Sequence, residues 1–137
     1  MKPAPFTYHR PETAAEAVGL LADLGDGVKL LAGGQSLVPM LNLRLAVFDD
    51  LVDVSRIDEL SGIERREGHL WIGAGTTEAA VGRSAEVAAA VPLLARATPL
   101  IGHRQIRNRG TIGGSLAHAG PAAEYPAVVL ALDAELE

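Results

Sequence analysis

The sequence predicts an α+β protein made of an N-terminal α/β subdomain, residues 1–55, and a second, α+β subdomain, residues 56–137. Three observations carry this prediction. Strand-like runs alternate with a helical pattern up to about residue 55, an alternation of apolar and polar residues follows, and two alanine-rich stretches come next. Alternating strands and helices favour a parallel sheet, whereas an alternating pattern around a turn favours an antiparallel hairpin. The two halves are therefore expected to contain different sheets.

The first subdomain begins with a strand-like segment, residues 6–8, followed by a helical pattern. Thr13 is expected to cap this helix, because Glu16 stands three residues later, and Gly25 is expected to end it. The next run, VKLLA at residues 28–32, has the length and apolar content of a buried strand.

A double glycine then leads into a second expected helix, residues 37–45. Ser36 is in the position of its N-cap, and Pro39 is compatible with a helix because it falls in the first turn. Residues 51–54, LVDV, form a third short strand. This order indicates a small parallel α/β unit.

The second subdomain is expected to open with an antiparallel hairpin that turns at Glu67–Gly68 and carries Trp71 on its inner face. Residues 79–91 and 92–101 are expected to be helical, with Pro92 separating them. The last residues, AVVLALDAELE, are typical of a strand or hairpin that lacks a partner. We therefore expect the natural protein to continue, or another chain to supply the missing strands.

Composition excludes several function classes. With 48% apolar and 21% charged residues, the chain has the composition of a folded globular protein. A formal net charge of -5 disfavours a general nucleic-acid binder. The N-terminal segment has no apolar run typical of a signal peptide, and no later run has the length of a membrane span. These features predict a cytoplasmic protein.

The chain contains no cysteine, so an iron–sulfur cluster with cysteine ligands would have to lie on another polypeptide. The four histidines, His9, His69, His103 and His118, show no metal-ligand spacing. The sequence therefore predicts no metal site.

Two glycine pairs, AGGQS at residues 32–36 and TIGGS at residues 111–115, are the main candidate binding segments. Glycine pairs allow a ligand to approach the main chain, and successive N–H groups in such a turn form an anion-binding nest. Two opposed nests would suit the two charges of a diphosphate, which predicts a dinucleotide ligand. Each pair is equally compatible with an ordinary turn or bulge.

Neither segment has the spacing of a Rossmann G-x-G-x-x-G motif or the Lys-Ser/Thr pair of a Walker loop. The nucleotide-binding classes that depend on those motifs are excluded.

Two longer stretches carry a family resemblance that covers the whole chain: LLAGGQSLVPMLNLR at residues 30–44 and IGHRQIRNRGTIGGSLAHAGPAAEYP at residues 101–126. They resemble the FAD-binding subunit of molybdenum hydroxylases, the family of carbon monoxide dehydrogenase and xanthine dehydrogenase. The resemblance implies a FAD-binding fold of the vanillyl-alcohol-oxidase type, with the diphosphate between the two subdomains. The C-terminal domain of that family is absent from this chain.

The resemblance also implies a set of FAD contacts. It assigns the first diphosphate loop and its neighbours to Leu30, Leu31, Ala32, Gly33, Gly34, Gln35, Ser36 and Leu37, and a second loop to Thr111, Ile112, Gly113, Gly114 and Ser115. Ile101 is placed near the isoalloxazine ring, and Glu124 near the ribityl hydroxyls. Gly120 replaces a family aspartate, which removes one expected carboxylate.

Other residues have competing interpretations. His118 either approaches the flavin or makes a structural hydrogen bond. Arg104, Arg107 and Arg109 face the diphosphate, face a partner subunit, or form a solvated positive rim. Trp71 is expected in the core, and the sequence does not decide the role of Tyr125.

The implied function is an electron-transfer flavoprotein subunit with no catalytic residue of its own. Molybdopterin and iron–sulfur clusters would lie on partner subunits, and FAD would pass electrons to an external acceptor. The alternative is a binding or assembly module of the same fold that does not retain FAD.

Overall fold

The computed structural model describes all residues from Met1 to Glu137 and confirms the α+β class. Three short parallel strands form the first sheet: β1 (Thr7–His9), β2 (Val28–Leu31) and β3 (Asp50–Asp53). Their order is β1-β3-β2, so the last strand in the sequence occupies the centre. The parallel pairing predicted for this part of the chain is confirmed.

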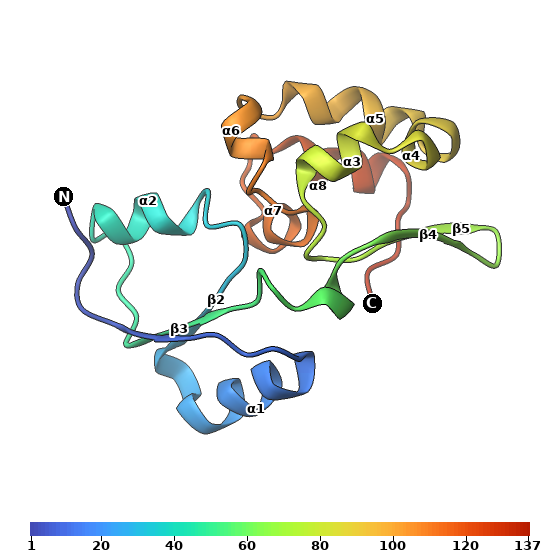
Figure 1. Cartoon of the computed structure of the whole chain (residues 1–137). Helices are drawn as coiled ribbons and strands as arrows, with labels where there is room; N and C mark the ends of the chain where they lie inside the picture. The colour runs from blue at the N-terminus through green and yellow to red at the C-terminus, as the bar shows by residue number, and fades with distance from the viewer.

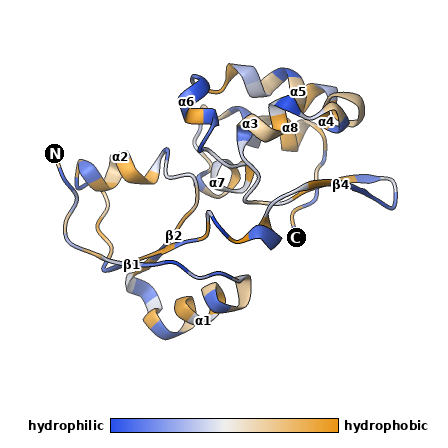
Figure 2. Ribbon diagram, in the orientation of Figure 1, coloured by the Kyte–Doolittle hydropathy of each residue, from blue (hydrophilic) through white to orange (hydrophobic).

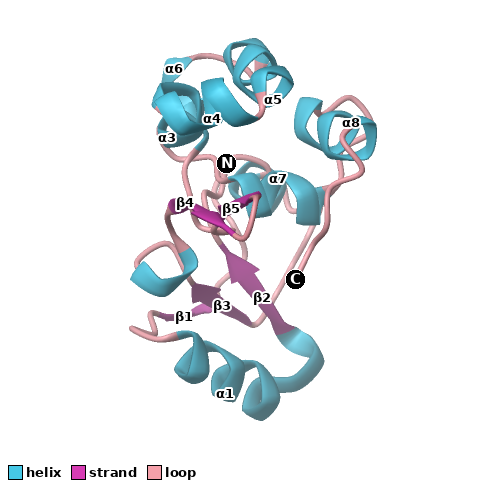
Figure 3. Ribbon diagram, turned by 90° about the vertical axis from the view of Figure 1, so that its right-hand side faces the viewer, coloured by secondary structure: helices cyan, strands magenta, loops and turns pink.

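Helix α1 (Ala14–Leu24) connects β1 to β2 and is followed by the short 3-10 helix η1 (Gly25–Gly27). Figures 1 and 3 show α1 on the side of the sheet opposite to the later helices. Ala17 on α1, Val52 on β3 and Ile57 beyond it form a small buried cluster. Burying these apolar side chains holds the helix against the central strand.

The predicted caps of α1 are present. The Thr13 hydroxyl accepts a hydrogen bond from the Glu16 N–H at 3.1 Å, and the Glu16 carboxylate accepts one from the Glu12 N–H at 2.8 Å. Gly25 ends the helix with φ +67°, and its N–H donates to the Leu21 carbonyl. Local side-chain chemistry therefore defines both ends of this helix.

Helix α2 (Leu37–Asn42) is shorter than predicted, and Ser36 makes no capping hydrogen bond. The Ser36 backbone is in the α region, φ -101° and ψ -47°, instead of the extended conformation of a cap residue. The prediction that Ser36 caps this helix is wrong. Figures 1 and 2 show α2 standing apart from the other helices with apolar residues along it, and Val38 is 40% exposed.

The predicted hairpin is formed by β4 (Ile63–Arg66) and β5 (His69–Ile72), which follow the 3-10 helix η2 (Asp58–Leu60). The turn is at Glu67–Gly68 as predicted, but the face on which Trp71 lies differs from the prediction. Leu70 and Ile72 pack against the core, whereas Trp71 is on the opposite face, where the Arg66 guanidinium lies 4.1 Å from its ring centroid. The placement of Trp71 on the inner face is therefore wrong, since neighbouring residues of a strand point to opposite faces.

The alanine-rich region is helical but is divided more finely than predicted, into α3 (Glu78–Arg83), α4 (Ala85–Ala90), α5 (Pro92–Ala97) and η3 (Thr98–Leu100). Ser84 separates the first two, because its hydroxyl accepts a hydrogen bond from the Val87 N–H at 3.2 Å and starts α4. Pro92 begins α5, as expected for a residue that lacks an N–H group.

Three more helices complete the chain: α6 (Arg104–Arg107), α7 (Ile112–His118) and α8 (Glu124–Ala131). The strand or hairpin predicted at the C-terminus is wrong, because residues 127–131 belong to α8 and no strand follows them. Tyr125 and Val128, three residues apart, are both buried, and Pro126 falls in the first helical turn. None of the helices has both the length and the apolar character needed to cross a membrane.

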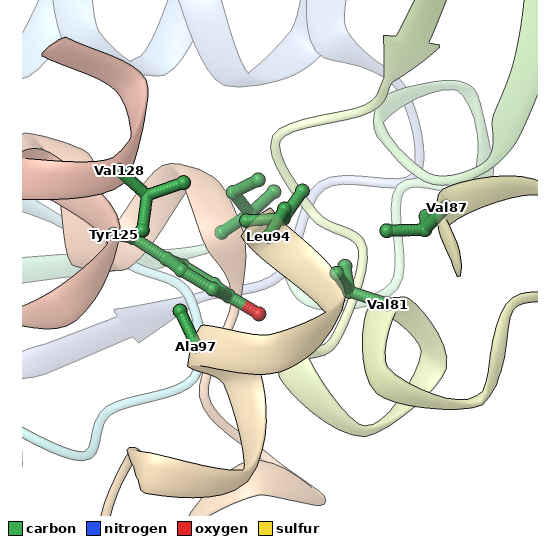
Figure 4. Packing of buried hydrophobic residues seen from close by; sticks show 7 residues of the cluster. Val81, Val87, Leu94, Ala97, Tyr125 and Val128 are labelled. Atoms are coloured by element: carbon green, nitrogen blue, oxygen red, sulfur yellow. The ribbon is translucent and has the colours of Figure 1, made fainter. Parts of the chain in front are cut away.

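The main core joins these helices to the hairpin. Its buried side chains are Val81, Val87, Leu94, Ala97, Ile112, Tyr125 and Val128. Figure 4 shows Tyr125 lying among Leu94, Ala97 and Val128. The Tyr125 hydroxyl lies 2.9 Å from the Thr98 hydroxyl, which in turn donates to the Leu94 carbonyl at 2.8 Å.

Replacing Tyr125 with phenylalanine is expected to lower the free energy of unfolding by about 1 kcal/mol. The change keeps the apolar ring but removes the hydrogen bond to Thr98, whose oxygen loses its buried donor. Urea denaturation of both proteins would measure the difference. An unchanged free energy of unfolding would show that this hydrogen bond contributes nothing to stability.

Candidate functional site

The first glycine segment follows β2 at the carboxyl end of the parallel sheet and leads into α2. None of the backbone N–H groups from Ala32 to Ser36 donates a hydrogen bond within the protein. Gly34 has φ +73°, a conformation that glycine adopts at little cost, and the Gln35 side chain donates to the Gly33 carbonyl at 3.1 Å. The expected run of free donors is therefore present in this loop.

The second glycine pair is arranged differently. Gly113 and Gly114 lie in the first turn of α7, which Thr111 caps by accepting a hydrogen bond from the Gly114 N–H at 3.1 Å. The N–H groups of Ile112 and Gly113 donate to the carbonyls of Thr76 and Ala74. The expectation of a second loop with free N–H groups is wrong, because these donors are already used within the protein.

Close packing explains the glycines of this second segment. A Cβ atom at Gly113 would lie 2.5 Å from the Ala74 Cβ, and one at Gly114 would lie 2.8 Å from the Thr111 hydroxyl. Ile112 is buried in the main core. Ser115 is half-buried, and its hydroxyl has no partner in the chain, so it is the free polar side chain of this segment.

Folding nevertheless brings the two segments together. A Cβ atom at Gly33 would lie 2.2 Å from the Arg109 carbonyl oxygen and 2.7 Å from the Gly110 Cα. A Cβ atom at Gly114 would lie 3.7 Å from the Ala32 Cβ. The free N–H groups of the first loop are therefore next to the start of α7, although about 80 residues separate them in the sequence.

Arg107 has a structural role that the sequence did not indicate. Its guanidinium donates to the carbonyls of Ile101 at 2.7 Å, Gly102 at 3.2 Å and Pro99 at 3.4 Å. It thereby holds the turn that carries Ile101, a half-buried residue that packs against the main core. Arg104 and Arg109 are exposed.

The remaining candidates divide into core and surface residues. Tyr125 belongs to the core, where burial raises its pKa to about 12. Glu124 begins α8 and is half-buried, whereas His118 is exposed at the end of α7. Of these three residues, Glu124 is the one that is half-buried and whose carboxylate has no hydrogen-bond or ion-pair partner.

Sequence reasoning missed Glu78, the first residue of α3, which is only 5% exposed. Burial, and then the nearby charge of Glu124, raises its pKa from 4.5 to about 7, although the positive charge of Arg107 opposes this. One of its carboxylate oxygens has no hydrogen-bond partner. A glutamate in the first turn of a helix is common, so the sequence offers no signal for this burial.

Asp53 was also missed. It ends β3, and its carboxylate accepts hydrogen bonds from the Tyr8 hydroxyl and, at 2.8 Å, from the Ser55 N–H. Burial alone would raise its pKa, but these hydrogen bonds and the charge of Arg109 outweigh it, and the pKa is lowered. A negative charge is thus fixed at the carboxyl end of the sheet.

Comparison with known proteins identifies the relatives of this arrangement. Residues 4–137 match the model of the FAD binding domain in molybdopterin dehydrogenase. The chain is 48% identical over 134 residues to the carbon monoxide dehydrogenase medium chain of Hydrogenophaga pseudoflava, covering 98% of this chain and 47% of that protein. It is 49% identical to the 6-hydroxypseudooxynicotine dehydrogenase complex subunit alpha of Paenarthrobacter nicotinovorans, covering 98% and 45%.

Solved structures give the same result. The match to carbon monoxide dehydrogenase from Hydrogenophaga pseudoflava has a TM-score of 0.93 at 49% identity and covers 96% of this chain and 46% of that one. The match to quinoline 2-oxidoreductase from Pseudomonas putida 86 has a TM-score of 0.88 at 40% identity, covering 92% and 44%. The chain thus spans about half the length of these relatives. It belongs to the family of FAD-binding domains of molybdopterin dehydrogenases.

Proposed function

We propose that this chain is the FAD-binding part of a medium subunit of a molybdenum hydroxylase. The observation that carries the proposal is the run of free N–H groups from Ala32 to Ser36 beside the start of α7. A diphosphate offers only acceptor oxygens and two negative charges, so a row of unused backbone donors fits it. The absence of Cβ atoms at Gly33 and Gly34 leaves the main chain accessible.

The main proposed contacts have defined roles. The N–H groups of the first loop bind the diphosphate, the Ser115 hydroxyl adds one donor from α7, and Glu124 accepts from the ribityl hydroxyls. Ile101 shields the flavin ring from water, and Arg107 holds the turn that positions it. The full set of proposed cofactor-binding residues remains Leu30, Leu31, Ala32, Gly33, Gly34, Gln35, Ser36, Leu37, Ile101, Thr111, Ile112, Gly113, Gly114, Ser115 and Glu124.

A division of labour between subunits is part of the same proposal. When bound, FAD supplies the redox chemistry, and the chain supplies binding, orientation and exclusion of water. Because the chain contains no cysteine, iron–sulfur clusters would belong to a partner subunit. Molybdopterin would belong to a second partner subunit. We place the protein in the cytoplasm, as an electron-transfer subunit that delivers electrons to an external acceptor.

The division into subdomains 1–55 and 56–137 is part of the same proposal. The parallel sheet ends at Asp53 and the antiparallel hairpin begins at Ile63, so each subdomain would contribute one side of the FAD site. The alternative function is an assembly module of the same fold that does not retain FAD. The exposed apolar side chains of α2 and the residues after it, such as Leu43 and Leu45, favour contact with further protein.

Adding FAD to the purified chain is expected to give a yellow protein that releases FAD on denaturation. Replacing Ser115 with alanine is expected to weaken FAD binding about tenfold, because one hydroxyl donor to an anionic group is lost. Flavin fluorescence titration measures both proteins. Ser61→Ala, at an exposed position after η2, is the matched control and is expected to bind FAD normally.

The proposal would be contradicted, and the assembly module favoured, by a chain that is colourless after mixing with millimolar FAD and removal of the unbound FAD. FAD binding that is equally strong in the Ser115→Ala variant would remove α7 from the site and leave the first loop as the candidate.

A further inference from the structure

Glu78 is a buried carboxyl group that the proposed cofactor contacts do not use. Its backbone is fixed, because the Glu78 N–H donates to the Gly110 carbonyl at 2.8 Å. Its side chain is enclosed, and one carboxylate oxygen has neither a hydrogen-bond partner nor solvent contact. A charged carboxylate in such a place is costly, whereas the protonated form is tolerated.

The carboxyl group packs against Gly110, which directly precedes the second glycine segment and lies close to Gly33 of the first. A Cβ atom at Gly110 would lie 2.7 Å from both carboxylate oxygens of Glu78. The Gly110 Cα also lies 2.7 Å from the position that a Cβ of Gly33 would occupy. A single glycine thus separates Glu78 from the loop that carries the free N–H groups.

Two charged side chains act on Glu78 before any ligand is present. Arg107 on α6 favours the ionised form, and Glu124 on α8 disfavours it. Tyr125 on α8 is a neutral neighbour, and η3 presents the uncharged Thr98. Two further charged residues lie on the other helices that pack against α3. Glu86 of α4 forms an ion pair with Arg65, and Arg96 of α5 is exposed. With its pKa raised to about 7, Glu78 is partly ionised near neutral pH.

We propose that Glu78 takes up a proton when a diphosphate binds at the first glycine loop, so that cofactor binding and protonation of this carboxyl group are coupled. The inference rests on the proposed function, because the diphosphate of FAD is the anion concerned. Glu78 is a positioning residue in this scheme: by becoming neutral, it removes a buried negative charge from behind the phosphate-binding backbone.

The size of the coupling follows from Coulomb's law. Two unit charges roughly 10 Å apart in a medium of effective dielectric constant about 20 shift a protonation equilibrium by roughly an order of magnitude. The diphosphate stays doubly charged throughout the neutral range, so its own titration does not obscure the effect. Linkage then requires FAD to bind more tightly at the pH at which Glu78 is protonated.

Calorimetric titration of the wild-type chain with FAD, in HEPES and in Tris buffer at pH 7.5, counts the protons taken up, because the two buffers differ in their enthalpy of ionisation. We expect an uptake of about half a proton and about tenfold tighter binding at pH 6 than at pH 9. The variant Glu78→Gln is expected to take up no proton and to bind with nearly constant affinity over this range. Glu86→Gln, an exposed carboxylate on α4, is the matched control and should behave as the wild type.

The possible failures are distinguishable. Wild-type binding of FAD without proton uptake overturns the coupling and leaves the proposed function intact, and this measurement needs no variant to fold. Proton uptake that persists in the Glu78→Gln variant assigns the proton to another group and also overturns it. No FAD binding at any pH overturns the proposed function and the coupling together.

Discussion

Replacing Gly33 with alanine is expected to lower the free energy of unfolding by about 3 kcal/mol and to weaken FAD binding. The added Cβ atom would lie 2.2 Å from the Arg109 carbonyl oxygen and 2.7 Å from the Gly110 Cα. Both are backbone atoms, so no side-chain rotation relieves the collision, and the two glycine segments must separate. Urea denaturation measures the loss of stability, and flavin fluorescence measures the binding.

Gly19→Ala is the matched control for this change. Gly19 lies within α1, and no atom would be within 4 Å of an added Cβ. Alanine there is expected to stabilise the protein by ~0.5–1 kcal/mol, because alanine loses less backbone entropy than glycine in a helix. If Gly33→Ala were as stable as the wild type, the two glycine segments would not be in the close contact on which the proposed site depends.

Elements governed by neighbouring residues could be predicted from the sequence. Helix α1 depends on Thr13, Glu16 and Gly25, which lie within a few residues of the groups they cap. The hairpin at Glu67–Gly68 likewise depends on a local turn and the pattern beside it. Such signals are complete within a short window of sequence.

The incorrect predictions arose where distant contacts decide the structure. The Val128–Val129 pair is compatible with a strand or a helix, and burial of Tyr125 and Val128 against the other helices selects the helix. Trp71 lies one residue away from two side chains that reach the core, and a shift of one residue reverses the face.

The candidate site shows the same division. The double glycine at residues 33–34 was a local signal, and its free donors are present. The second pair looked alike in sequence, but the Gly113 N–H donates to the carbonyl of Ala74, far away in the chain, and the Gly114 N–H donates to the Thr111 hydroxyl. Nothing in the sequence around Glu78 reveals that Gly110 packs against its carboxyl group.

The stability of the chain without FAD is expected to fall as the pH rises from about 5 to about 8, because of Glu78. Its pKa is about 7 in the folded state, above the ordinary value of 4.5 expected when the chain is unfolded. The folded state therefore binds more protons in this range, so the stabilising contribution is complete below pH 4.5 and is lost as the pH passes 7. The loss is at most about 3 kcal/mol.

Glu78→Gln is expected to remove this part of the pH dependence. The variant loses some stability at every pH, because a buried amide also lacks partners, so the quantity to compare is the change in the free energy of unfolding between pH 5 and pH 8. Urea denaturation of wild type, Glu78→Gln and the exposed control Glu86→Gln at the two pH values separates the contributions. Equal pH dependence in all three proteins would show that the Glu78 carboxyl group ionises normally, and its coupling to a bound anion would then have no basis.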